Sequence, residues 1–280
     1  MFAVLMGIFA LVGWVVGSYF IGNWMLGFVI FLGIAVAINV VSYFYSSKII
    51  LWTYKVKIVT EAESPRLYRI VRGISQKAGL PMPRVGIIPT QNPNAFATGR
   101  NPKNAVVCAT EGIMRLLDDS ELEGVMAHEM AHVKDRDILV MTVAATVAGA
   151  ISFAARFAFW GSLMDRRDNG NMILLLLVAI TAPLAAMLVQ LAISRSREYK
   201  ADYEGAMFIG RPLALAKALE KLEVGNKANP IKFGSPTSSS LFIVNPFNGG
   251  TMVSLFSTHP PMKERIRRLK EQAKQMGQYA

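Results

Sequence analysis

Long apolar runs without a charged side chain constrain the fold of this chain more than any other feature. Residues 2–20 and 24–45 form two such runs, separated by only three residues. Each run has about 20 residues, enough for a helix to cross the hydrocarbon core of a bilayer. Because 52% of the 280 residues are hydrophobic, the chain is also too apolar for an ordinary soluble domain. We therefore expect residues 1–45 to form a transmembrane hairpin.

A cleavable signal peptide is the alternative interpretation of the first apolar run. A signal peptide begins with a basic segment, and no Lys or Arg precedes or interrupts residues 2–20. A second apolar run also follows almost at once. The aromatic residues Trp14 and Tyr19, and Trp24 at the start of the second run, suit the interfaces of a bilayer. The sequence favours a hairpin that is retained.

A second pair of apolar runs occupies residues 138–193. Residues 138–155 are uncharged, the run continues past Arg156 to Met164, and residues 172–193 carry no charge. A charge inside a membrane span is costly unless it reaches the interface or finds a partner. Arg156 therefore leaves two interpretations: a second spanning hairpin, or a long hairpin buried against the soluble part. We expect the spanning hairpin.

The basic residues predict which way the spans are oriented. Of 30 Lys and Arg residues, only Arg156, Arg166 and Arg167 lie outside residues 46–137 and 194–280. Positive charge collects on the cytoplasmic side of membrane proteins. We therefore expect a multi-pass protein of the cytoplasmic (inner) cell membrane with both soluble segments in the cytoplasm. A net charge of +11 could also indicate a nucleic-acid binder, but its position beside the spans argues against nucleic acid as a partner.

The two soluble segments predict helices around a small β-sheet. A helical pattern covers residues 61–78, and short strands are expected at 84–89, 95–99 and 105–109. If one of these strands lies at an exposed edge, an extended peptide could pair with it through main-chain hydrogen bonds. The other interpretation is a plain sheet that covers a helix. The single cysteine, Cys108, excludes an internal disulfide framework.

The most specific chemical signal is the H-E-x-x-H pattern from His128 to His132. Ser120 and Glu123 match the pattern of a helix capping box, so we expect this segment to be helical. Residues four apart share a face of a helix, and both imidazoles can then bind one metal ion. Glu129 is placed to take a proton from water at that metal. The pattern is a known zinc signature, and the chain has only three histidines.

A catalytic zinc needs a third protein ligand and an open position. We assign Glu198, which follows the last apolar run in a segment with a helical pattern. Asp202 lies four residues further on the same face, where it can accept a hydrogen bond from a ligating histidine, in our interpretation His128. His259 is the rival third ligand. The expected cofactor is one Zn²⁺ per chain.

At this point the motifs carry a family resemblance. The chain resembles the HtpX family of membrane zinc metalloproteases, relatives of the CAAX prenyl proteases. The matching segments are 94–99, 128–132, 194–202 and 258–261, followed by Glu264 and Arg265. The resemblance implies that His128, His132 and Glu198 bind zinc and that Glu129 is the general base. It also implies a substrate groove that includes Asn94, Ala95, Phe96 and Ala97, with His259 and Arg265 close to the reacting groups.

The fold class that we expect is therefore a mainly α membrane protein with a small β-sheet, in which a zincin-like (gluzincin-type) metalloprotease domain is joined to two transmembrane hairpins. The predicted domains are the hairpins at 1–45 and 138–193 and the two parts of the protease domain at 46–137 and 194–280. Residues 224–256, rich in Gly, Asn, Ser and Pro, predict either a lid near the site or a disordered connector.

With this resemblance, the expected function is hydrolysis of internal peptide bonds in misfolded or damaged membrane proteins at the cytoplasmic face of the bilayer, as part of a stress response. Glu198 lies five residues after Ile193, so at 1.5 Å per helical residue it is within about 10 Å of the end of a span. The expected partners are protein substrates and the lipid bilayer. The alternatives are a CAAX-type prenyl-protein protease and a membrane adaptor with a structural zinc.

Overall fold

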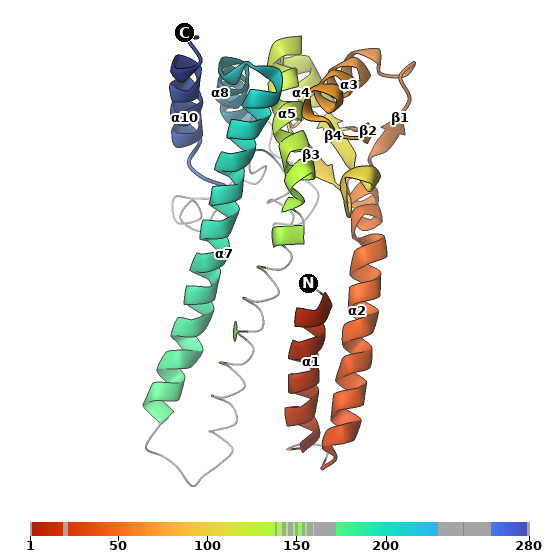
Figure 1. Cartoon of the computed structure of the whole chain (residues 1–280), viewed down its shortest axis with the longest axis vertical. Coiled ribbons are helices and arrows are strands. Elements are labelled where there is room, and N and C mark those ends of the chain that lie inside the picture. Colours follow the sequence, from red (N-terminus) through yellow and green to blue (C-terminus); the bar gives the residue numbers. More distant parts are fainter. Residues whose placement is uncertain are drawn as a thin grey trace. The chain divides into compact units, whose positions relative to one another are not determined.

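The structure, a computed structural model, describes residues 2–18, 22–137, 139–141, 144, 148, 151–152, 155, 159, 172–228, 243 and 259–278. Figure 1 shows the order of its elements: α1 (Phe2–Val16), α2 (Trp24–Thr53), β1 (Lys57–Val59), α3 (Pro65–Ala78), β2 (Arg84–Ile88), β3 (Ala95–Thr98), β4 (Val106–Thr110), α4 (Glu111–Leu116), α5 (Asp119–Asp135), α7 (Met172–Ile209), α8 (Pro212–Ala228) and α10 (Met262–Gln275). The mainly helical fold with one small sheet is confirmed. The chain divides into two compact units, Met1–Ser46 with Leu139–Ile193 and Ser47–Ile138 with Ser194–Ala280.

Glycines allow α1 and the start of α2 to pack closely in the first unit. A β-carbon added at Gly13 would lie 2.6 Å from the carbonyl oxygen of Gly27, and one at Gly17 would lie 2.7 Å from that of Asn23. Small residues at such contacts are typical of helix pairs in membranes. Gly22, in the turn between the helices, has a φ of +71°, which glycine adopts without strain.

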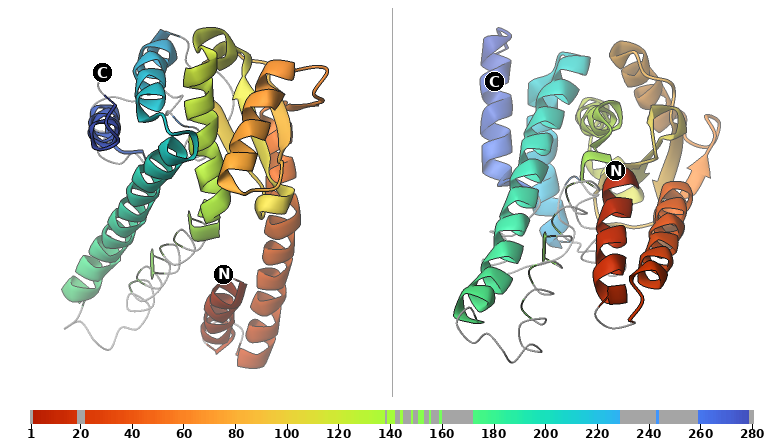
Figure 2. Two further views of the ribbon diagram at one scale, coloured as in Figure 1. Left: turned by 45° about the horizontal axis from the view of Figure 1, so that its top comes forward. Right: turned by 60° about the horizontal axis from the view of Figure 1, so that its bottom comes forward.

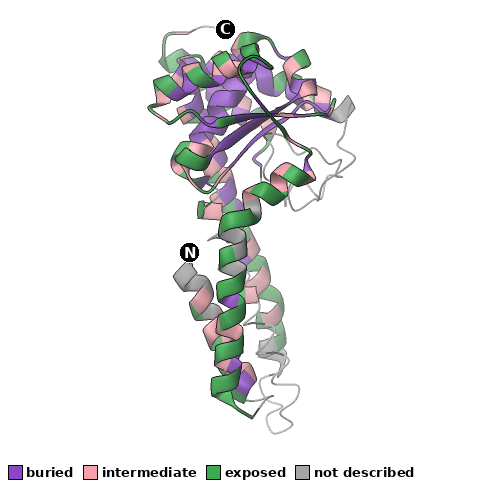
Figure 3. Ribbon diagram, turned by 90° about the vertical axis from the view of Figure 1, so that its right-hand side faces the viewer, coloured by how far each residue is buried: buried purple, intermediate pink, exposed green. Residues whose placement is uncertain are grey.

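Large apolar side chains are exposed on the long helices of the chain. Trp24, Phe44, Leu177 and Leu188 are each about half exposed, and Figure 3 colours long stretches of these helices as exposed. Such apolar surface indicates contact with lipid or protein. Within the described residues, Leu176–Ile209 in α7 is long and apolar enough to cross a membrane. One such helix fits a membrane protein, and the two spanning hairpins stay a prediction.

A four-stranded sheet lies in the second unit. Its strand order is β1-β2-β4-β3, with β2 and β4 parallel and the two outer pairs antiparallel. The three predicted strands are confirmed to within one residue at each end. β1 was not predicted, because it has only three residues and buries only Val59. Since β3 pairs with β4 alone within the described sheet, it is an edge strand, and it carries three of the predicted groove residues.

The core of the second unit lies between the sheet and the helices α3, α5 and α8. Leu67, Val71 and Ile74 of α3 recur at helical spacing and are buried beside Val125 and Met126 of α5. Full burial of one such side chain contributes about 1.5–3 kcal/mol. The helix α3 begins at Pro65 rather than at the predicted residue 61, because a turn precedes it. The packing holds α5 against β3, which brings the zinc-signature helix to the edge of the sheet.

The helix α5 confirms the predicted helix, but the predicted capping box is wrong. Asp118, not Ser120, caps the helix: its carboxylate accepts a hydrogen bond from the N–H of Glu121 at 2.8 Å, and the Glu121 carboxylate accepts one from the N–H of Asp118 at 3.0 Å. The patterns D-x-x-E and S-x-x-E overlap here by two residues. Tertiary packing decides between them, because buried Glu121 pairs with Lys221 of α8 at 2.6 Å.

The helix α7 extends further than the predicted apolar run, and α8 extends into the segment predicted as a loop. α7 continues from the apolar residues 172–193 to Ile209 in one helix, although Pro183 lies inside it. α8 ends at Ala228, so the predicted loop at 224–256 begins as helix. Of the rest of that loop, only Ile243 belongs to the described residues. Figure 2 shows α8 beside α10, and α8 also packs against α5.

Candidate active site

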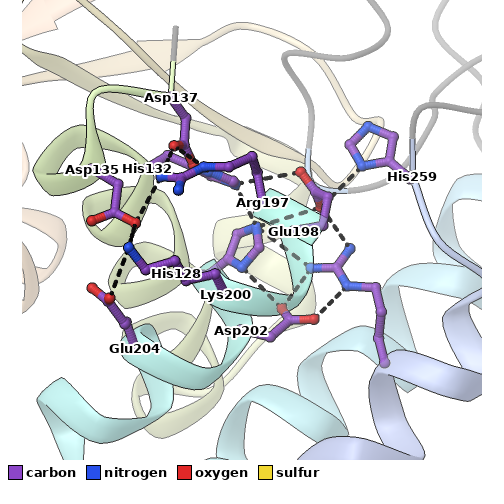
Figure 4. A network of polar contacts seen from close by, with 11 residues as sticks. His128, His132, Asp135, Asp137, Arg197, Glu198, Lys200, Asp202, Glu204 and His259 are labelled. Atoms are coloured by element: carbon purple, nitrogen blue, oxygen red, sulfur yellow. Dashed lines mark hydrogen bonds and ion pairs between the residues drawn. The ribbon is translucent and has the colours of Figure 1, made fainter. Parts of the chain in front are cut away.

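Two helices bring the three predicted metal ligands to one point. His128 and His132 lie on α5 and Glu198 lies on α7, and their donor atoms all lie within 4.8 Å of one another. The two Nε2 atoms of the histidines are 3.1 Å apart, and Nε2 of His132 is 3.4 Å from Oε1 of Glu198 (Figure 4). Nε2 of His128 is 3.9 Å from Oε2 of Glu198. The predicted ligands therefore converge although Glu198 follows His132 by 66 positions in the chain.

A glycine in α7 makes this convergence possible. A β-carbon at Gly205 would lie 2.7 Å from the backbone nitrogen of His128 and 2.8 Å from its Cα. Distances below 3.0 Å are not tolerated by a side chain without movement of the backbone. Gly205 therefore allows the backbone of α7 to contact that of α5 at the first ligand. Nothing in the sequence around Gly205 indicates this role.

The donor set fits a zinc ion. Donor atoms about 2.1 Å from a tetrahedral zinc lie about 3.4 Å from one another, as Nε2 of His132 and Oε1 of Glu198 do. Each histidine also has a carboxylate beside Nδ1: Asp202 at 2.9 Å from His128 and Asp137 at 2.6 Å from His132. A proton on each Nδ1 leaves the two Nε2 lone pairs facing one another. Lone pairs at 3.1 Å repel unless a proton or a cation lies between them.

The carboxylates around the two histidines favour a positive charge at this site, either a proton or a metal ion. Burial opposes the charge on His132, but its contacts with the carboxylates of Asp137 and Glu198 outweigh burial and raise the pKa of His132 to about 10. In His128 burial dominates over Asp202 and lowers the pKa. Burial thus favours the neutral imidazole of His128, which is the form that binds a metal.

Glu129 lies between the ligand helix and the edge strand. Its side chain is buried, and the backbone of Ala97 in β3 is close enough to act on its pKa, which it lowers. Burial raises the pKa of Glu129 to about 7, against the opposing effect of His132. A carboxylate whose pKa is close to neutral pH can both accept and return a proton. The structure thus places the predicted general base beside a strand that could hold a peptide.

Asp202 and Arg265 form a buried ion pair behind His128. Nε and Nη2 of Arg265 donate to the two oxygens of Asp202 at 2.8 and 2.7 Å, and Nη1 lies 3.4 Å from Oε2 of Glu198. Arg265 is fully buried, and the charge of Asp202 keeps its pKa raised despite this burial. The predicted place of Asp202 beside His128 agrees with this geometry. Arg265 approaches the site, as predicted, from the side of Asp202.

His259 lies next to the third ligand. Its Nδ1 is 3.1 Å from Oε2 of Glu198, and its side chain is almost fully buried. It is not one of the three residues whose donor atoms converge in the described part of the chain, so the geometry favours Glu198 over His259 as third ligand. The predicted contact of His259 with a reacting group stays a prediction.

The predicted groove residues lie at the outer edge of the sheet. Asn94 precedes β3, and Ala95, Phe96 and Ala97 belong to it; all four are buried. The carbonyl of Ala95 accepts a hydrogen bond from the N–H of Ile243 at 3.2 Å. The edge of β3 therefore already accepts a backbone hydrogen bond from a residue distant in the chain. That a substrate peptide pairs with the same edge stays a prediction.

Sequence reasoning missed four residues of this site: Asp137, Arg197, Gly205 and Ile243. Asp137 and Arg197 looked like ordinary surface charges, because both lie in charged stretches beside apolar runs. A signal was present for Asp137, since an acidic residue shortly after a ligating histidine is a candidate partner for its second nitrogen. No comparable signal marks the other three.

A histidine pair on one helix, a carboxylate from a second helix and a buried glutamate beside them define the class of metal-dependent peptidases. Comparison with known proteins agrees. The pattern of peptidase family M48 matches residues 61–273. A protease HtpX homologue of Thermococcus sibiricus is 49% identical over 98% of this chain and 94% of its own length, and one of Syntrophobacter fumaroxidans is 53% identical over 87% and 89%. The chain belongs to peptidase family M48, among the HtpX proteases.

A solved structure shares the fold. The crystal structure of S. mikatae Ste24p aligns with 94% of this chain at a TM-score of 0.60 and 17% sequence identity. The chain spans 62% of the length of that protein. Because the sequence identity is low, the likeness concerns the fold alone. With the family match, it confirms the predicted resemblance. The protein is a metalloprotease, and its apolar α7 fits a membrane protein.

Proposed function

We propose that this protein is a zinc-dependent endopeptidase that cleaves misfolded or damaged membrane proteins at the cytoplasmic face of the cell membrane, as part of a stress response. The observation that carries the proposal is the convergence of His128, His132 and Glu198 within 4.8 Å, with buried Glu129 beside them. Among the described residues three protein ligands converge, which leaves the open position that distinguishes a catalytic zinc from a structural one. This argues against the alternative of an adaptor with a structural zinc.

The residues of the site have distinct roles in the proposed reaction. Zinc, when bound by His128, His132 and Glu198, supplies Lewis-acid chemistry, which acidifies water and polarises a carbonyl group. Glu129 takes the proton of the attacking water and later passes it to the leaving amine. Asp202 holds the proton of His128 on Nδ1, so that Nε2 faces the metal. His259, beside Glu198, is the candidate donor to the developing oxyanion.

An extended peptide is the substrate shape that the site favours. The backbone of β3 runs beside Glu129, since α5 packs against β3 and the backbone of Ala97 acts on the pKa of that carboxylate. The hydrogen bond from Ile243 to Ala95 supports the idea that this edge accepts a peptide backbone. Unfolded segments of any sequence offer such a backbone. This supports misfolded proteins as substrates, rather than one lipidated terminus as in a CAAX-type protease.

The helix α7 supports a site close to the end of a membrane span. It carries both the apolar residues 172–193 and Glu198 without interruption. At 1.5 Å per residue, the third ligand is about 8 Å along the helix from Ile193. If residues 172–193 cross the bilayer, membrane proteins are the substrates within reach. Their cytoplasmic segments are then the parts that are cleaved.

Substitution of Glu129 by Gln tests the proposal. The variant should keep one zinc per chain, because the ligands are intact, but should lose at least about 100-fold in activity on an unfolded, unlipidated protein such as casein. The measurement is zinc content and proteolysis of the full chain in detergent. His132→Ala is the matched control, which should lose the metal as well. Cleavage at the wild-type rate by Glu129→Gln would reject the assignment, and a strict requirement for a lipidated substrate would favour the CAAX-type alternative.

A further inference from the structure

The carboxylate of Asp137 reaches His132 because α5 ends abruptly. Residues five apart on a helix point in directions about 140° apart, so a continuing helix would turn Asp137 away from His132. Arg136 ends the helix instead, with a φ of +55° in the left-handed region. That conformation costs a residue other than glycine about 1–2 kcal/mol. It returns Asp137 toward the preceding turn, where its Oδ2 lies 2.6 Å from Nδ1 of His132.

The second oxygen of Asp137 is bound by Arg197 of α7. The guanidinium of Arg197 also donates to Asp135 at 2.7 Å, and Lys200 pairs with Asp135 in turn (Figure 4). Arg197 directly precedes the third ligand in the chain. The ion pairs therefore join the end of α5, which carries His132, to the turn of α7 that carries Glu198.

The two histidines thus have matching surroundings. Behind His128 stand Asp202 and Arg265, and behind His132 stand Asp137 and Arg197. In each case an aspartate contacts Nδ1 and an arginine binds that aspartate. The first pair is fully buried, whereas the side chain of Arg197 is about one fifth exposed.

We propose that Asp137 is a positioning residue for His132 and that Arg197 acts through Asp137. Asp137 holds the proton of His132 on Nδ1 and fixes the ring plane, so that the Nε2 lone pair faces the metal position. Arg197 holds the carboxylate in the orientation that this contact needs. The inference rests on the proposed zinc site. It opposes the simpler interpretation in which Asp135, Asp137 and Arg197 only tie α5 to α7.

Asp135 is a matched control for Asp137. Both are acidic residues at the end of α5, and both pair with Arg197, but only Asp137 contacts a histidine. We expect Asp137→Asn to weaken zinc binding by about 10–100-fold, the usual effect of losing such a partner, and Asp135→Asn to change it by less than about threefold. Zinc affinity is measured on the full chain in detergent by competition with a chelator. Equal losses in the two variants would overturn the proposal.

A spectroscopic readout separates positioning from stability. Selective ¹⁵N labelling of histidine gives signals from only three residues. In Asp137→Asn the Nδ1 and Nε2 signals of His132 should shift, while those of His259 stay in place; in Asp135→Asn all three should stay. Arg197→Lys should retain more zinc affinity than Arg197→Ala, because a cation still faces Asp137. Unchanged His132 signals in Asp137→Asn would overturn the proposal. This readout also applies to metal-free protein, so it is informative even if the wild-type chain binds no zinc and the proposed function fails.

Discussion

At the scale of single residues, burial decides how much an arginine contributes to the stability of this protein. Arg265 and Arg267 lie two positions apart on α10, and each guanidinium contacts at least two carboxylate oxygens. Arg265 is fully buried against Asp202, whereas the Arg267 side chain is more than half exposed. A buried charge that loses its partner is costly, while an exposed pair contributes little. The sequence places both in one basic run and does not distinguish them.

Substitution of Arg265 by Ala should lower the free energy of unfolding by about 3–5 kcal/mol, because it leaves the buried charge of Asp202 without its cation and with only the contact to His128. Arg267→Ala should lower it by less than about 1 kcal/mol. Denaturant unfolding of the detergent-solubilised protein measures both. If Arg265→Ala kept wild-type stability and zinc affinity but reduced kcat, the arginine would instead contact the transition state, as the family resemblance implies.

At the scale of elements, the site depends on how closely α5 and α7 approach. Gly205 removes the β-carbon that would collide with the backbone of His128, and Gly124 does the same for the contact of α5 with Leu215 of α8. At such a backbone contact an added side chain cannot be accommodated by a change of rotamer, because the atoms it meets belong to the backbone of a stiff helix. The position of Glu198 relative to the histidines therefore depends on residues that have no chemistry of their own.

Substitution of Gly205 by Ala should destabilise the protein by about 1–3 kcal/mol and reduce zinc affinity, because α7 must move away from His128. Gly73→Ala is the matched control: Gly73 lies inside α3, where an added β-carbon meets nothing within 4 Å, so this change should stabilise by up to about 1 kcal/mol. Thermal midpoints and zinc content measure both effects. A Gly205→Ala variant with wild-type zinc affinity would refute the close-approach argument.

At the scale of the whole molecule, charge and apolarity are separated along the chain. Residues 1–45 contain no Lys or Arg, and residues 138–193 contain three, while the other segments contain the remaining 27 of 30. The large exposed apolar side chains of α2 and α7 need a nonpolar environment. Both observations support two spanning hairpins with the soluble segments on one side of the membrane.

Labelling of introduced cysteines tests this topology. Cys108 gives little background, because it is buried and burial raises the pKa of its thiol, which disfavours the reactive thiolate. In intact spheroplasts an impermeant maleimide should label Asn23→Cys and Asn169→Cys in the predicted hairpin turns. Lys103→Cys, in the soluble segment, should react only after permeabilisation. Labelling of Lys103→Cys in intact cells, or protection of Asn169→Cys, would reject the predicted orientation or the second hairpin.

The sequence by itself determined what depends on neighbours along the chain. The apolar runs, the helical spacing of His128 and His132, and three of the four strands follow from local pattern, and the structure and the family comparison agree with them. The helical spacing of Glu198 and Asp202 is equally local, whereas the place of Glu198 beside the histidines was implied by the family resemblance. These features need no knowledge of which elements meet.

Only the tertiary structure decided which distant groups meet. It chose Asp118 over Ser120 as the helix cap, because buried Glu121 pairs with Lys221 of α8. It brought Arg197 to Asp137 and Gly205 to His128, across about 60 residues or more of chain. The physical reason is that the energy of such contacts comes from burial and complementary charge, which local pattern does not encode.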